Sequence, residues 1–115
     1  MPERKHELML TSAVQRVGAA TVAGKVEWSR GSDTDDRDVT FVTRVAGYIL
    51  VVFENSRAER YEFVIKTVDG DVVDWISSET CQYLGQLHAE VRRRVMLADE
   101  AIESILVYLG AELSL

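Results

Sequence analysis

Residues 59–77, ERYEFVIKTVDGDVVDWIS, decide the fold because two β-rich runs are separated there by the pair Asp69-Gly70. An Asp-Gly pair between two such runs is the strongest short-range signal of a β-hairpin, since glycine adopts the positive φ that a tight turn requires. The runs 59–68 and 71–77 are therefore predicted to pair as antiparallel strands. This hairpin is the reference point for predicting the elements on either side.

Three more strands are predicted upstream of the hairpin. Residues 48–55, YILVVFEN, are apolar on both alternating faces, which is typical of a central strand that is covered on both sides. Residues 38–45, DVTFVTRV, form a second strand, which ends at the turn Ala46-Gly47. Residues 19–30 also alternate between two faces, and this pattern predicts a further strand with one buried face.

Two helices are predicted to flank the strands. The first, at about residues 3–17, has apolar residues at helical spacing, and Gly18 stands where glycine ends helices. The second is long and runs from an N-cap at Ser77 or Ser78 to about Gly110. At 100° per residue, one apolar stripe follows the long helix: Leu84, Leu87, Val91, Val95, Ala98, Ile102, Ile105 and Leu109. This stripe is predicted to pack on the sheet.

The predicted order of elements defines an α+β fold. It consists of an N-terminal helix, a five-stranded antiparallel β-meander and a long C-terminal helix packed on the sheet. The sequence contains no internal repeat and no linker, and its only proline is Pro2. Residues 1–115 are therefore expected to form a single domain.

The composition limits the partners of the protein. Thirteen basic and nineteen acidic side chains give a formal net charge of −6, which repels nucleic acid and anionic lipid and favours either solubility or a basic partner. No apolar run approaches the roughly 20 residues that span a bilayer, and no signal peptide is recognised. We therefore expect a cytoplasmic protein that binds neither nucleic acid nor membranes, and the single cysteine, Cys81, agrees with this compartment.

The outward side of the long helix carries a candidate interface. Arg92 and Arg93 point away from the apolar stripe, and two carboxylates follow in nearly the same directions further along the helix. Two copies that meet antiparallel near Leu97 would bring these opposite charges together. The candidate interface residues are Arg92, Arg93, Leu97, Glu100, Glu103 and Tyr108. The alternative interpretation is a solvated helix face whose charges bind nothing.

Motifs for catalysis and for metal binding are missing from the sequence. No Cys-x-x-Cys, His-Glu-x-x-His, glycine-rich phosphate loop or Gly-x-Ser-x-Gly turn occurs. The acidic segment 31–38 lacks the glycine and glutamate positions of a calcium loop, so it is predicted to be a solvated hairpin loop. Cys81 and His88 lie two helical turns apart, too far for a nucleophile and its base. No catalytic residue, cofactor or metal is therefore expected.

Aromatic residues on the predicted strands indicate a second kind of site. Their spacing is typical of cross-strand core pairs, but a curved sheet lined by them could also form a pocket closed by the long helix. The candidate pocket residues are Trp28, Phe41, Tyr61, Phe63 and Trp75.

The sequence thus leaves two function classes open. The first is a small, acidic, non-enzymatic interaction module that forms a homodimer and binds another, basic protein. The alternative is a small-molecule binding domain or small enzyme that uses the aromatic pocket.

Overall fold

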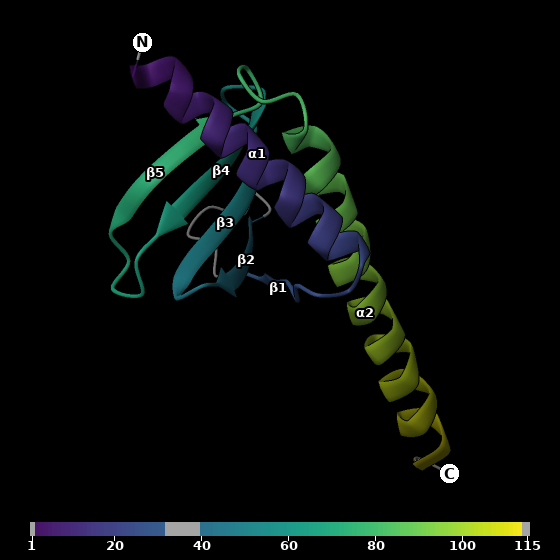
Figure 1. Ribbon diagram of the computed structural model, residues 1–115. Coiled ribbons are helices and arrows are strands. Elements are labelled where there is room, and N and C mark those ends of the chain that lie inside the picture. The colour runs from purple at the N-terminus through teal and green to yellow at the C-terminus, as the bar shows by residue number, and fades with distance from the viewer. Residues whose placement is uncertain (1, 32–39, 114–115) are drawn as a thin grey trace.

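The computed structural model describes residues 2–31 and 40–113, and it confirms the predicted α+β fold. Its five strands form one antiparallel sheet in the order β1-β2-β3-β4-β5, so each strand pairs with its neighbour in the sequence (Figure 1). The predicted acidic loop lies almost entirely outside the described residues. The elements are α1 (Pro2–Val22), β1 (Ser29–Arg30), β2 (Thr40–Val45), β3 (Tyr48–Asn55), β4 (Arg60–Lys66), β5 (Val72–Ser77) and α2 (Leu84–Leu113).

Both predicted tight turns are present. Ala46 and Gly47 have φ values of 54° and 81°, the two positive angles of the turn that matches the twist of a hairpin. In the β4–β5 hairpin, Gly70 has a φ of 94°, and its N–H donates to the Thr67 carbonyl at 2.9 Å. The hairpin is thus formed as predicted, with a loop longer than the Asp-Gly pair alone.

The first helix is longer than predicted, because Gly24 rather than Gly18 ends it. The N–H of Lys25 donates to the Ala20 carbonyl, and the N–H of Gly24 donates to the Thr21 carbonyl. This pair of bonds, with a φ of 74° at Gly24, is the Schellman arrangement that closes a helix. The predicted strand at residues 19–30 is therefore wrong except at β1, because its first residues continue α1.

The second helix begins later than predicted, at Leu84. The hydroxyl of Ser78 accepts the N–H of Tyr61 at 2.9 Å, so this serine fixes the end of the sheet and does not cap α2. Ser77 belongs to β5, and its carbonyl accepts the N–H of Cys81 in the turn that follows. At the other end α2 continues past Gly110 to Leu113.

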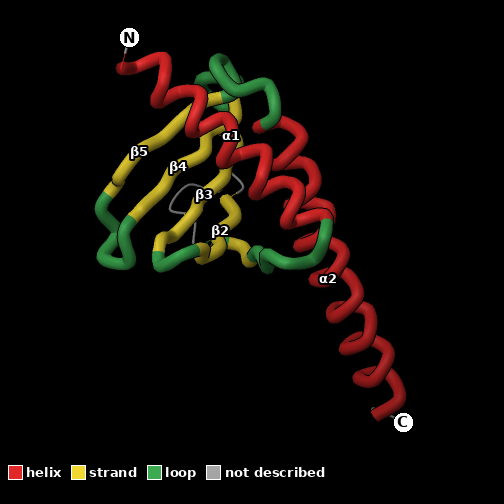
Figure 2. Tube along the Cα trace, viewed as in Figure 1, coloured by secondary structure: helices red, strands yellow, loops and turns green. Residues whose placement is uncertain are grey.

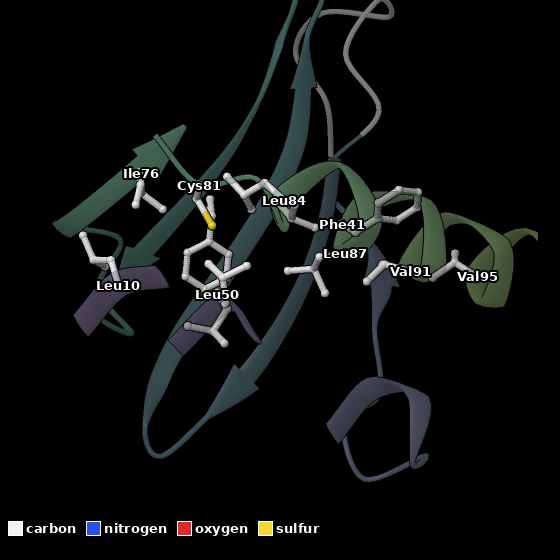
Figure 3. Close-up of a cluster of buried hydrophobic side chains, with 12 residues drawn as sticks. Leu10, Phe41, Leu50, Ile76, Cys81, Leu84, Leu87, Val91 and Val95 are labelled. Carbon is white, nitrogen blue, oxygen red and sulfur yellow. The ribbon is translucent and has the colours of Figure 1, made fainter. Parts of the chain in front are cut away.

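The core lies between one face of the sheet and the two helices. Phe41, Val52 and Phe63 lie opposite one another on β2, β3 and β4, and none of the three has exposed surface. Leu84 and Val91 of α2 belong to the same buried cluster (Figure 3). The tube view shows α1 crossing in front of the strands and α2 beside them, extending past the sheet (Figure 2).

The long helix makes the molecule elongated. Its principal dimensions are 68, 31 and 28 Å, and its radius of gyration is 16.5 Å. A compact domain of this length has a radius of gyration of about 13 Å. The excess comes from the C-terminal half of α2, which projects away from the sheet (Figure 1).

Candidate functional site

The apolar stripe of α2 is divided into a covered and an uncovered part. Leu84, Leu87, Val91 and Val95 are buried in the core. Further along the same line, Ile102 and Ile105 are each 57% exposed and Leu109 is 46% exposed. The prediction that the whole stripe packs on the sheet is confirmed as far as Val95 and is wrong beyond it. We call residues 98–110 the outer half of α2.

The apolar stripe of α2 becomes exposed just beyond its contacts with the end of α1 and with the segment around Trp28. Arg94 donates through Nη2 to the carbonyl of Val22, the last residue of α1, at 2.9 Å. The chain then turns at Gly24 and returns towards the sheet through Trp28, which lines an open pocket together with Val95. Every described residue from 97 to 110 is exposed.

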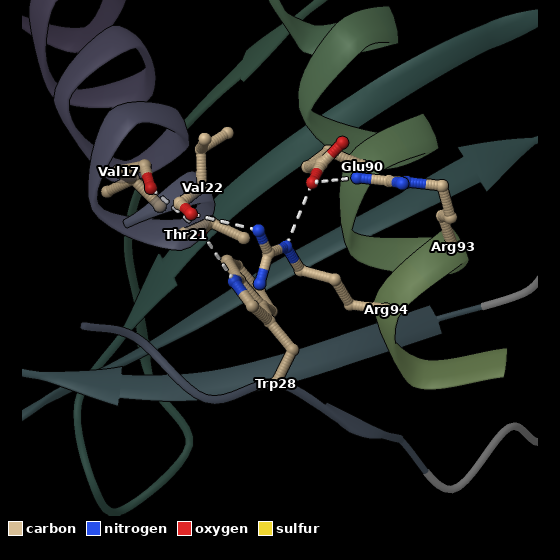
Figure 4. A network of polar contacts seen from close by, with 7 residues as sticks. All are labelled: Val17, Thr21, Val22, Trp28, Glu90, Arg93 and Arg94. Carbon is tan, nitrogen blue, oxygen red and sulfur yellow. Dashed lines mark hydrogen bonds and ion pairs between the residues drawn. The ribbon is translucent and has the colours of Figure 1, made fainter. Parts of the chain in front are cut away.

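A network of polar contacts fixes this junction (Figure 4). The indole Nε1 of Trp28 donates to the hydroxyl of Thr21 at 2.9 Å, and that hydroxyl donates to the Val17 carbonyl at 2.8 Å. Within α2, the Glu90 carboxylate accepts hydrogen bonds from Arg93 at 2.7 Å and from Arg94 at 2.9 Å. These two hydrogen bonds hold the pKa of Glu90 below its usual value. The network therefore aligns α2 with the end of α1 where the outer half begins.

The outer half exposes large apolar side chains on more than one side of the helix. Its exposed large apolar side chains are Ile102, Ile105, Leu106, Val107, Tyr108 and Leu109, and Leu97 is exposed just before it. Together they leave roughly 500 Å² or more of apolar surface uncovered, the patch size that marks interaction sites on isolated proteins. The surface of the outer half is therefore of the kind that another chain covers.

The predicted interface residues are all placed on the solvent side of α2. Arg92 and Arg93 are exposed on the side of the helix opposite the core, and Glu100 and Glu103 follow them further along. Leu97 and Tyr108 are also exposed. We call these six residues, together with Val107, the outward face. Glu100, Glu103 and Tyr108 border one shallow depression on the outer half.

The predicted pocket residues are not brought together around one cavity. Phe41 and Phe63 are fully buried core residues, and the ring of Tyr61 contacts that of His88 in a tilted arrangement with centroids 4.8 Å apart. Trp28 lines the pocket at the junction. Trp75 is half-exposed, with the Arg60 guanidinium 5.8 Å from its ring centroid.

The surface pockets are separate from one another, and Trp28 and Trp75 border different ones. One groove, of about 420 Å³, runs between α1 and α2 past Gly18 and Gln86. Another, of about 670 Å³, lies beside β5, where His6 contacts Asp74. The described residues contain no group of three or more His, Cys, Asp or Glu placed to hold a metal ion. No helix in this part of the chain is long and apolar enough to cross a membrane.

The sequence contained a signal for the outer half that the prediction did not use. Residues 105–109, ILVYL, are five consecutive apolar residues inside a helix. A single buried face accommodates about three or four apolar residues in two turns, so a continuous run places some of them on the solvent side. The run therefore indicates more than one covered face.

No protein-family model, curated protein or solved structure matches this chain.

Proposed function

We propose that this protein is a non-enzymatic interaction module that pairs with a second copy of itself through the outward face of α2 and binds another, basic protein. One observation carries the proposal. The apolar surface of α2 continues beyond Val95 without any cover from the described residues. Exposed apolar side chains at this density have no role in the stability of the isolated domain, so they point to assembly.

Charge favours a second copy in antiparallel orientation. In such a pair centred near Leu97, Arg92 of one copy approaches Glu103 of the other, and Arg93 approaches Glu100. The two-fold axis repeats both contacts, so four ion pairs form around the apolar centre. Exposed ion pairs contribute about 0–1 kcal/mol each, so they set the orientation, while Leu97, Val107 and Tyr108 supply most of the affinity.

The ligand-binding alternative has less support. It requires space between the aromatic face of the sheet and α2, but Phe41 and Phe63 fill the core there. The proposal of an interaction module is therefore preferred.

A charge-exchange experiment tests the self-pairing. The first variant combines Arg92→Glu with Arg93→Glu, and the second combines Glu100→Arg with Glu103→Arg. Each variant alone places like charges opposite each other, so we expect its dimer dissociation constant to rise at least about tenfold. A mixture of the two variants restores opposite charges at all four contacts. Sedimentation equilibrium of each variant and of the mixture is the measurement, with circular dichroism as the control for folding.

The expected result is a weak homodimer for each variant and a mixed dimer of wild-type strength. A wild-type protein that stays monomeric at high micromolar concentration would refute self-pairing. Dimers that both variants form as tightly as the wild type would show that another surface makes the contact.

A further inference from the structure

The stripe side of the outer half forms an apolar track that is separate from the outward face. The track begins in the pocket of about 450 Å³ between Trp28, Val95 and Ala98. It continues along the exposed side chains of Ile102, Ile105 and Leu109. We call the pocket and these side chains the outer track.

The spacing of the outer track suits another helix. Val95, Ala98, Ile102, Ile105 and Leu109 are separated by three, four, three and four residues. This alternation keeps a seam of apolar side chains facing a partner helix, as in a coiled coil. Extended strands and small ligands do not require such a periodic seam. The geometry therefore favours a helix-in-groove contact.

We propose that the outer track binds an amphipathic helix of a partner protein, whose apolar side fills the track and whose lysine or arginine residues lie along one edge of it. This inference rests on the proposed function as an interaction module. It adds the binding site and the chemistry of the partner.

Charge selects the basic partner. Asp99 lies on one edge of the outer track, at about 80° from its centre line by helical periodicity, and Glu103 of the outward face follows on the same side at about 120°. The sequence from residue 95 to the end contains no lysine or arginine. Two basic residues line the pocket, Arg94 and Arg30. Arg94 is already hydrogen-bonded to Glu90 and to the Val22 carbonyl. A helix with cations along this edge is complementary to it.

A second copy fits the outer track less well. Two outer halves in contact through their tracks would place Asp99 and Glu103 of both copies along the same edge, without basic residues in either outer half to offset them. The track also points away from the outward face, because Ile102 and Val107 differ by about 140° around the helix. Self-pairing through the outward face therefore leaves the track free for a different chain.

The probe for the experiment is a synthetic 18-residue helix of leucine and lysine with leucines at the i, i+3, i+4 and i+7 positions. A peptide in which every lysine is replaced by glutamate is the control. The full chain is prepared with Trp75→Phe, which leaves Trp28 in the pocket as the single tryptophan. We expect saturable binding of the lysine peptide, with a change in Trp28 fluorescence, and at least tenfold weaker binding of the glutamate peptide.

Matched substitutions separate the outer track from general attraction to an acidic protein. Ile102→Ser with Ile105→Ser leaves the charge unchanged and is expected to weaken peptide binding at least about tenfold. Val107 is at least as exposed as the two isoleucines but lies on the outward face, and Val107→Ser is expected to change the peptide affinity by less than about twofold. Asp99→Asn is expected to weaken binding and to reduce its dependence on salt.

Three results would overturn the inference. The first is equal binding of the lysine and glutamate peptides. The second is wild-type affinity in the double serine variant, which would mean that charge alone attracts the peptide. The third is a self-association of the wild type that the double serine variant abolishes, which would assign the track to a second copy. The variant with Arg92→Glu and Arg93→Glu weakens self-pairing but leaves the outer track unchanged. Peptide binding measured in this variant therefore tests the outer track independently of the dimer.

Discussion

Val95 and Ile102 lie about two turns apart on one line of α2, yet Val95 is 7% exposed and Ile102 is 57% exposed. The difference comes from what faces them and not from their chemistry. Val95 lies over the core, beside Trp28, whereas the described part of the chain offers Ile102 no cover. One continuous stripe thus serves folding in its first half and is available for assembly in its second.

A matched pair of leucine substitutions tests this division. Leu84→Ala removes a fully buried side chain and is expected to lower the free energy of unfolding by about 2–5 kcal/mol. Leu106→Ala removes a side chain that is 64% exposed and is expected to change it by less than about 0.5 kcal/mol. Urea denaturation at low protein concentration is the measurement. Equal losses for both variants would contradict the division.

The hydrogen bond between Trp28 and Thr21 is expected to stabilise the junction. Thr21→Val keeps the shape of the side chain but removes the acceptor for the indole N–H, and this loss costs about 1–3 kcal/mol. In a double-mutant cycle with Trp28→Phe, we expect a coupling energy of about 1 kcal/mol. Thermal or urea unfolding of the four proteins gives this energy. Strictly additive effects would show that the bond does not couple the two residues.

Two glycines are predicted to respond to alanine in opposite directions. Gly18 lies inside α1, and an added Cβ would be 4.0 Å from Leu87 Cδ1, an ordinary contact. Gly18→Ala is therefore expected to raise the free energy of unfolding by about 0.5–1 kcal/mol. Gly70 has a φ of 94°, which strains any residue with a Cβ. Gly70→Ala is therefore expected to lower the free energy of unfolding by about 1 kcal/mol or more. A destabilised Gly18→Ala variant would mean that the α1–α2 contact is tighter than this distance indicates.

The ion pairs of Glu90 predict a pH dependence of stability. Because the pKa of Glu90 is lowered in the folded protein, its contribution is present above the pKa of the unfolded state and is lost as the pH falls through the folded pKa. Glu90→Gln removes this contribution. We expect the melting temperature of the variant to be lower than that of the wild type at pH 7. The difference between the two melting temperatures is expected to shrink below about pH 4.3. A difference that is constant from pH 7 to pH 3 would assign the effect to packing.

The helix boundaries illustrate why local patterns were insufficient. The prediction ended the first helix at Gly18 and placed Gly24 in a strand. In the fold, α1 continues to Val22, where Thr21 is buried and bonded to Trp28. Similarly, Ser78 resembles an N-cap, but the N–H of Tyr61, 17 residues earlier in the chain, occupies its hydroxyl. In both cases a tertiary contact outweighed a local preference.

The candidate site shows the same limit. Periodicity alone placed Arg92, Arg93, Glu100 and Glu103 on the side of α2 away from the core, because helix geometry fixes directions around the axis. The aromatic pocket was a weaker inference, since spacing along strands does not say whether facing side chains fill the space between layers. Phe41 and Phe63 fill it.

The sequence by itself determined the α+β class, the antiparallel meander, the Asp-Gly hairpin and the apolar line of α2. These features follow from backbone geometry and from the periods of helix and strand, which act over a few residues. Only the tertiary structure decided where the cover on α2 ends, because that point depends on how far the sheet, the end of α1 and the segment around Trp28 reach along the helix. Burial is a property of the neighbours in space, so the same apolar spacing is core at Val95 and open surface at Ile102.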